Sequence, residues 1–321
     1  MTVRKFNYVR FGIFIAIVLA ILIAIIVGIS SLVSHIKYTK TYEYKLINIG
    51  YSKEESDIIN SKLNNTEIDE LLKLEYNKDY VSFINEKYFL YSNLDKYLEY
   101  KKNNKSYDNS KVISIINTEA NIDWFDNEKE TDTSLNELML VNRLYGLNKE
   151  YEVEDVVTIP SKYAYSGNKI SESILDDIMA LADDAKENGY TFVVSGSYRS
   201  YKDQEKLYNS YVNSMGKSEA DKVVARPGHS EYETGLSFGF VPYNKQYSSD
   251  KAVLSEEYLW LKENAHNYGF IFRFESGKEY LTGFNADTWR LRYVGEEAAS
   301  IIYANNLTFE EYYAYYVKGK Q

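Results

Sequence analysis

The fold of this chain is decided by the stretch ARPGHSEYETGLSFG, which occupies residues 225–239. Pro227 and Gly228 end the helix predicted before them, because proline cannot continue a helix. The apolar run at 236–241 predicts a strand. Between the two lies a polar turn with His229, one of only three histidines in the chain. The stretch therefore joins a helix to a strand through a turn rich in polar side chains.

Helix and strand patterns alternate from about residue 111 onward, which predicts an α+β domain over residues 111–321. Strands are predicted at 111–116, 139–141, 191–195, 236–241, 270–274 and 289–294. Apolar residues at helical spacing predict one helix that ends at Asn188-Gly189 and another that ends at Gly269. Three further helix starts follow from capping pairs, which are Ser200 with Asp203, Ser218 with Asp221 and Thr308 with Glu311.

Residues 38–105 predict a series of short helices. Ser52 and Glu55 have the spacing of a capping box, and Thr66 is the predicted start of a further helix. Tyrosines and leucines recur at helical spacing from Tyr88 to Leu98. We interpret this part as a helical stalk or subdomain, joined to the α+β domain by the polar linker at 101–110.

The N-terminus carries an unbroken run of 23 uncharged residues, Phe11–Val33. An apolar helix of about 20 residues can cross a bilayer, so residues 11–33 predict a transmembrane helix. Arg4, Lys5 and Arg10 precede the run, which predicts that residues 1–10 stay in the cytoplasm and that the rest faces outward. The alternative is a cleaved signal peptide, but the run is long for one and no cleavage signal follows it.

The overall composition excludes several kinds of site. The chain has no cysteine, which rules out disulfides, thiolate zinc sites and cysteine nucleophiles. Its net charge is −10. All charged residues before residue 38 are basic, so the remainder of the chain is acidic. An acidic domain argues against nucleic acid as a partner. His35 lies at the membrane edge, which leaves two histidines for any active site.

Five blocks of sequence together resemble the VanY-type D-alanyl-D-alanine carboxypeptidases. They are LVNR at 140–143, SGSYRS at 195–200, the 225–239 stretch, NAHNYGFI at 264–271 and TGFNADTWRLRYVG at 282–295. The resemblance covers roughly residues 110–300 and implies a zinc D-Ala-D-Ala peptidase domain on a membrane-anchored chain. It also implies one zinc ion held by two histidines and an aspartate, with a glutamate as general base.

The chain departs from that family pattern at every metal ligand. The pattern is Ser-x-His-x-x-Gly-x-x-x-Asp, followed by Glu-Pro-Trp-His. Tyr232 and Arg290 stand at the two histidine positions, Gly239 at the aspartate, Asp287 at the general base and Thr288 at the proline. A neutral phenol binds zinc poorly, glycine offers no ligand, and a protonated guanidinium has no lone pair to give. We therefore expect no zinc and no other cofactor.

Other parts of the implied cleft match the family. Arg199 stands at the position that steadies the oxyanion, and Arg199, Gln204 and Ser230 stand where the family holds the peptide terminus. Two readings stay open: the cleft still binds a peptide carboxylate, or these residues persist only as scaffold. His229 occupies a non-ligating family position, and His266 falls in a helix that the family uses for packing.

We interpret the chain as a membrane-anchored, extracytoplasmic pseudoenzyme of the bacterial cell wall that binds a peptidoglycan stem peptide. Arg199 and Asp287 are then vestigial catalytic residues. Two alternatives remain: an active peptidoglycan-trimming carboxypeptidase with an unusual site, and a structural module that binds an envelope protein. Arg290 is further expected to point into the cleft and to form an ion pair with Asp287.

Overall fold

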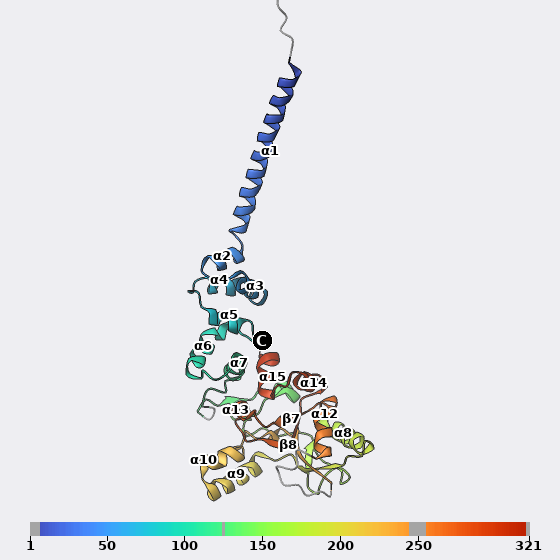
Figure 1. The fold of residues 1–321 in the computed structure, drawn as a ribbon. Coiled ribbons are helices and arrows are strands. Elements are labelled where there is room, and N and C mark those ends of the chain that lie inside the picture. Colours follow the sequence, from blue (N-terminus) through green and yellow to red (C-terminus); the bar gives the residue numbers. More distant parts are fainter. Residues whose placement is uncertain (1–6, 124–125, 244–254, 319–321) are drawn as a thin grey trace, which may run out of the picture. The chain divides into compact units, whose positions relative to one another are not determined.

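The structure is a computed structural model that describes residues 7–123, 126–243 and 255–318. The chain divides into two compact units, Met1–Ser110 and Lys111–Gln321. Figure 1 labels the α-helices of both units together with β7 and β8.

The N-terminal unit begins with α1 (Tyr8–Tyr38), a helix without a single buried side chain. Its mean hydropathy reaches 3.3 over an 18-residue window, so its length and composition make it a candidate membrane span. A signal sequence near the N-terminus would pass the same test. An apolar helix with no buried side chain among the described residues is favoured by an apolar environment.

The rest of the N-terminal unit consists of short helices. They are α2 (Tyr42–Asn48), α3 (Lys53–Lys62), α4 (Asn65–Leu71), α5 (Lys78–Ile84), the 3₁₀ turn η1 (Tyr91–Asn93) and α6 (Leu94–Asn103). The predicted capping box of Ser52 and Glu55 is confirmed at the start of α3. The predicted start at Thr66 is wrong, because Asn64 forms a capping box with Glu67 and begins α4 earlier. Buried Leu46, Ile59 and Leu71 form part of the core of these helices.

The C-terminal unit contains a four-stranded antiparallel sheet with the strand order β5-β6-β8-β7. Its strands are β5 (Phe192–Gly196), β6 (Ser237–Pro242), β7 (Phe270–Phe274) and β8 (Asp287–Tyr293). Two small sheets pair β1 (Lys129–Glu130) with β2 (Tyr145–Gly146) and β3 (Val156–Thr158) with β4 (Lys169–Ser171). The four strands of the main sheet fall where the sequence predicts them.

Helices accompany this sheet in the C-terminal unit, which gives the α+β class that the sequence predicts (Figure 1). They are α7 (Asn109–Asn117), α8 (Leu175–Glu187), α9 (Tyr201–Met215), α10 (Lys217–Val223), α12 (Glu256–Asn264), α13 (Glu279–Thr282), α14 (Glu296–Asn305) and α15 (Phe309–Tyr312). The short helical turns are η2 (Thr133–Leu138), η3 (Glu172–Ile174), η4 (Glu231–Thr234), η5 (Ala265–Tyr268) and η6 (Tyr313–Val317). The main core packs α8 and α12 against apolar side chains of the sheet such as Phe238, Phe240 and Leu291.

Two predicted strands are wrong. Residues 111–116 lie in α7, where Val112–Ile116 are all buried. A helix buried on every side shows the same unbroken apolar run as a buried strand. Residues 139–141 lie outside the strands, and side chains satisfy their carbonyl groups in place of a neighbouring strand. Arg292 Nη2 donates to Met139 O at 2.8 Å, and Thr131 Oγ1 donates to Leu140 O at 2.9 Å.

Capping predictions in the C-terminal unit hold at two of three helices. Ser200 caps α9, and Thr308 forms a capping box with Glu311 at the start of α15. The predicted cap of Ser218 with Asp221 is wrong, because α10 starts after Gly216 and no side chain caps it. Asp221 instead accepts hydrogen bonds from Arg226 and from Tyr208 Oη.

Candidate functional site

A cleft of about 450 Å³ opens beside the amino end of η4 and the start of β8. Its walls come from α9, α10, η4, the end of β7 and the segment that leads into β8. The structure brings Arg199, Gln204, Ser230, Tyr232, Asp287 and Arg290 together in its lining. These six residues, which the sequence singles out, therefore share one cleft in the fold, whereas Gly239 and His266 are not part of its lining.

The register of the sheet places three positions side by side beneath this cleft. Gly196 of β5 pairs with Gly239 of β6, and Gly239 pairs with Arg290 of β8. Directly paired residues project their side chains to the same face of a sheet. Two neighbouring strands thus present bare backbone next to the Arg290 side chain.

The Tyr232 side chain fills the space above those two glycines. A Cβ atom built on Gly239 would lie 2.9 Å from Tyr232 Oη, and one built on Gly196 would lie 3.1 Å from it. Tyr232 is buried, with 8% of its surface exposed. The phenol at the first histidine position therefore uses the room that a side chain at the aspartate position would need. The two departures from the family pattern are coupled by packing.

Two guanidinium groups contact the ring of Tyr232. The Cζ atom of Arg290 lies 3.8 Å from the ring centroid, and that of Arg199 lies 4.9 Å from it. Both distances are those of cation–π contacts. Arg290 Nη2 also donates to Asp287 Oδ2 at 2.7 Å, which confirms the expected ion pair. The Arg290 side chain is 17% exposed and that of Asp287 is 39% exposed.

Arg199 is held by a short chain of hydrogen bonds. Its Nη1 donates to Gln204 Oε1 at 2.7 Å, and Gln204 Nε2 donates to the Ala225 carbonyl at 2.7 Å. Burial lowers the pKa of Arg199, the neighbouring Tyr232 opposes that shift, and Arg290 lowers the pKa further by repulsion. The guanidinium nonetheless stays protonated at any physiological pH.

The turn that carries Ser230 and Tyr232 is stabilised from within. Ser230 Oγ accepts from the Tyr232 amide at 3.3 Å and caps η4. Glu233 accepts from the amides of Gly228 at 3.0 Å and Ser230 at 3.1 Å. Burial raises the pKa of Glu233 to about 7, although these amides and Arg199 pull it down. Ser230 thus has a local structural role as well as a place in the cleft lining.

The two histidines of the C-terminal unit have different surroundings. His229 is buried in the cleft wall, with Nδ1 at 2.7 Å from the Asn142 carbonyl and Nε2 at 3.2 Å from Glu128 Oε1. His266 lies outside the cleft and stacks on Tyr303 at a centroid distance of 3.9 Å. Burial lowers the pKa of His266, which favours its neutral form.

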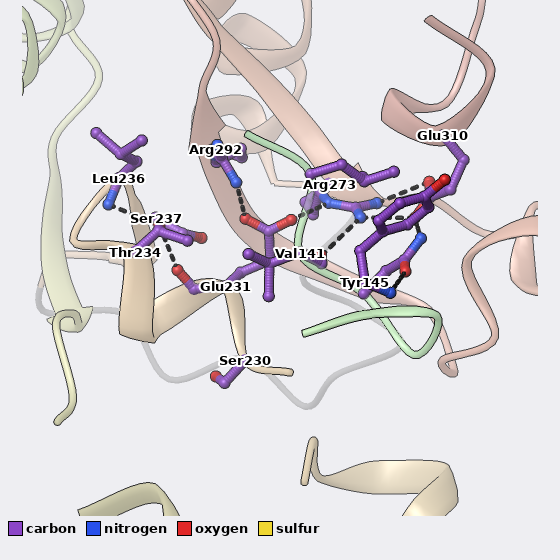
Figure 2. A network of polar contacts seen from close by, with 12 residues as sticks. Val141, Tyr145, Ser230, Glu231, Thr234, Leu236, Ser237, Arg273, Arg292 and Glu310 are labelled. Atoms are coloured by element: carbon purple, nitrogen blue, oxygen red, sulfur yellow. Dashed lines mark hydrogen bonds and ion pairs between the residues drawn. The ribbon is translucent and has the colours of Figure 1, made fainter. Parts of the chain in front are cut away.

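A buried network of charges that sequence reasoning missed supports the turn from behind (Figure 2). Glu231 accepts from Arg273 Nε at 2.6 Å and from Arg292 Nη1, and Arg273 Nη2 donates to Glu310 at 2.6 Å. Burial raises the pKa of Glu231, but Arg292 and Arg273 outweigh burial and hold it below its ordinary value. The available signal was the presence of Arg273 and Arg292 inside the otherwise apolar predicted strands 270–274 and 289–294.

The side chains at the expected ligand positions do not fit a zinc ion. They offer a phenol, a glycine without a side chain and a guanidinium that already pairs with Asp287. Within the described residues, no group of three His, Cys, Asp or Glu side chains could hold a metal ion. The absence of zinc from the protein stays a prediction, and no chemistry through a metal is derived for this cleft.

Comparison with known proteins gives matches over the C-terminal unit. Residues 167–296 match the family described as VanY: D-alanyl-D-alanine carboxypeptidase. The chain is 34% identical over 183 residues to the "Putative carboxypeptidase YodJ" of Bacillus subtilis (strain 168), over 56% of this chain and 67% of that protein. It is 33% identical over 184 residues to a D-alanyl-D-alanine carboxypeptidase of Enterococcus faecalis (strain ATCC 700802 / V583), over 54% of this chain and 65% of that one.

A solved structure is similar in fold over the same part of the chain. The structure of LdcB, an LD-carboxypeptidase studied for peptidoglycan recognition, superposes with a TM-score of 0.55 at 33% identity. The match covers 60% of this chain and 93% of LdcB.

Proposed function

Because the chain belongs to the VanY family of D-alanyl-D-alanine carboxypeptidases, we propose that it binds a cell-wall peptide and does not hydrolyse it. Its C-terminal unit has the fold of the zinc peptidases of this family. The chain spans about two thirds of the length of its curated relatives, with 67% and 65% coverage. Substrate, activity and partners are accordingly proposals for this chain.

The observation that carries the proposal is the packing of Tyr232 over Gly239. A Cβ atom at Gly239 would lie 2.9 Å from the phenol hydroxyl, and the Cζ atom of Arg290 lies 3.8 Å from the centroid of the ring. Zinc peptidases need an ion with an open position for water. Here the protein's own side chains fill the equivalent space, so the general-base position, Asp287, has no metal-bound water to act on.

Retention of the rest of the cleft supports binding. Arg199, Gln204 and Ser230 line the cleft together, and the Arg199 side chain is oriented by Gln204 at 2.7 Å. Arginine is suited to a peptide carboxylate because its planar donors match the two oxygens. The ligand that fits the family is the stem peptide of peptidoglycan. The proposal for the rest of the chain is an anchor at residues 11–33, a helical stalk at 38–105 and an extracytoplasmic domain at 111–321.

The test uses the purified full-length protein in detergent and a synthetic stem pentapeptide, with and without added zinc. The proposal expects binding of the peptide and no release of D-Ala under either condition. The Enterococcus faecalis relative serves as the positive control for hydrolysis. Release of D-Ala that depends on zinc and disappears in Asp287→Ala would establish an active carboxypeptidase instead. Absence of both binding and hydrolysis would favour a module that binds an envelope protein.

The proposed topology has a separate test. Protease added to intact protoplasts should digest the chain beyond about residue 38, because the positively charged N-terminus favours the cytoplasmic side. Protection of the C-terminal unit until the membrane is opened would contradict the orientation. An N-terminus missing from the mature protein would identify α1 as a cleaved signal sequence.

A further inference from the structure

We propose that Arg290, which stands at a metal-ligand position of the family, forms a carboxylate site together with Arg199. This site binds the free C-terminus of a trimmed cell-wall peptide. The inference rests on the proposed function and specifies its ligand. The group bound beside Tyr232 is a terminal carboxylate, whereas a peptidase would place the amide bond to be cut there.

The charges around the cleft favour an anion. The chain as a whole is acidic, with a net charge of −10. In the cleft, however, Arg199 and Arg290 both contact Tyr232, and Asp287 is the carboxylate that pairs with one of them. The other acidic lining residue, Glu231, directs its carboxylate to Arg273 and Arg292 behind the turn. Two like charges in a partly desolvated cleft repel, and a bound carboxylate would relieve that repulsion.

The hydrogen-bond donors of the two arginines are mostly unused by the protein. Among the described residues, the side chain of Arg199 donates to Gln204 and that of Arg290 donates to Asp287. Each guanidinium carries several further N–H groups in a fixed plane. Contact with the Tyr232 ring fixes the position of both groups, so little side-chain entropy is lost when a carboxylate binds.

Apolar side chains in the cleft lining fit the apolar parts of a peptide. Leu207 and Tyr211 of α9, Val223 of α10 and Phe284 contribute to the lining. Val223 is 51% exposed and Tyr211 is 36% exposed, although both are apolar over most of their surface. Such a wall can contact the methyl groups of alanine residues next to the terminal carboxylate. A small inorganic anion would leave this wall uncovered.

The test compares two peptides on the full-length protein in detergent micelles by isothermal titration calorimetry. One is a stem tetrapeptide that ends in D-Ala with a free carboxylate, and the other is the same peptide with a C-terminal amide. We expect the acid to bind at least about tenfold more tightly, because charge-assisted bonds to arginine are lost with the amide. Equal affinity for acid and amide would overturn the inference and leave the proposed function standing. No binding of either peptide would overturn both.

Variants identify the arginine that makes the difference. Arg290→Gln and Arg199→Gln should each reduce the preference for the acid toward unity. Lys206→Gln is the matched control, because Lys206 is a cationic residue of α9 outside the cleft lining and pairs with Asp203 at 3.1 Å. It should keep the preference. If Arg290→Gln does not fold, Arg290→Lys keeps the charge and should retain only part of the preference. An unchanged preference in folded Arg290 variants would overturn the role of Arg290.

Discussion

The front and the back of the turn η4 differ in how their charges are satisfied. Behind the turn, Glu231, Arg273 and Arg292 have side chains that are at most 1% exposed, and each charge meets an opposite one. In front, Arg290 is 17% exposed and its partner Asp287 is 39% exposed. The back is a closed network that belongs to the scaffold. The front keeps donors available to a ligand, which is what a binding site requires.

This difference distinguishes residues that stabilise the family fold from residues at the positions of the family's catalytic site. The buried network holds the segment 139–141 and the turn in place through Arg292 and Arg273. The metal position lies one residue further along the chain, at Tyr232, and has been repacked. A scaffold with its network intact can therefore carry a cleft whose side chains differ from the family pattern.

The largest expected effect is on the back of the turn. Glu231→Ala leaves the buried guanidinium of Arg292 without its carboxylate and leaves Arg273 with Glu310 alone, so it should destabilise the protein by about 3–5 kcal/mol. Chemical denaturation followed by tryptophan fluorescence measures the change, since Trp289 packs on Phe240 in the core at 4.9 Å. Glu219→Ala, which removes an exposed ion pair with Lys222, is the control and should have little effect. A cost below 1 kcal/mol for Glu231→Ala would mean that the network is dispensable.

The pH dependence of stability tests the turn itself. Burial raises the pKa of Glu233 from 4.5 to about 7. The folded protein therefore retains this proton after the unfolded chain has lost it, and the free energy of unfolding should fall as pH rises between those two values. The fall should be on the order of 3 kcal/mol, with no further change from this group at higher pH. Glu233→Gln should remove this part of the slope, and a slope that survives in the variant must come from other groups.

The packing of Tyr232 against Gly239 on the front of the turn predicts that the stability effects of changing these two residues depend on each other. Gly239→Ala places a Cβ 2.9 Å from Tyr232 Oη and should cost about 1–3 kcal/mol. Tyr232→Phe removes the hydroxyl, so the same alanine should cost less in that background. Gly196→Ala is the matched comparison at 3.1 Å and should cost less than Gly239→Ala. Equal costs for Gly239→Ala in both backgrounds would show that the hydroxyl does not occupy this space.

The smallest expected effect is that of the ion pair at the cleft. Asp287 is more than one third exposed, so Asp287→Ala should cost about 1 kcal/mol or less. Arg290→Ala also loses its contact with Tyr232 and should cost about 1–2 kcal/mol. The double variant should cost less than the sum of the two, because both changes remove the same bond. Additive costs in the denaturation experiment would mean that the pair contributes nothing.

The sequence predicted those parts of the fold whose signals are local. The strands of the main sheet and the caps at Ser200 and Thr308 follow from short patterns. Residues 111–116 were mistaken for a strand because a helix buried on all sides has no apolar face to detect. No local signal excludes a strand at 139–141, because two of its three carbonyl groups accept from Arg292 and Arg273, which lie more than 100 residues away along the chain.

The sequence predicted which residues belong to the candidate site better than it predicted how they are arranged. The family pattern identified Tyr232, Gly239 and Arg290, and the Arg290–Asp287 pair followed from their spacing. The packing of Tyr232 against Gly239 could not be predicted from the sequence, because it depends on the register that pairs Gly196, Gly239 and Arg290 across three strands. Sheet register between distant segments is not encoded in local spacing.

The zinc content of the purified full-length protein tests the repacked metal position most directly. Protein dialysed against buffer with a slight excess of zinc, and then against metal-free buffer, is measured by mass spectrometry of the metal. A variant with Tyr232→His, Gly239→Asp and Arg290→His restores the family ligands and is the positive control for zinc uptake. The unmodified protein should retain far less than one zinc ion per chain, because a phenol and a guanidinium stand at the ligand positions. About one zinc ion per chain, lost on Tyr232→Phe, would contradict a metal-free cleft.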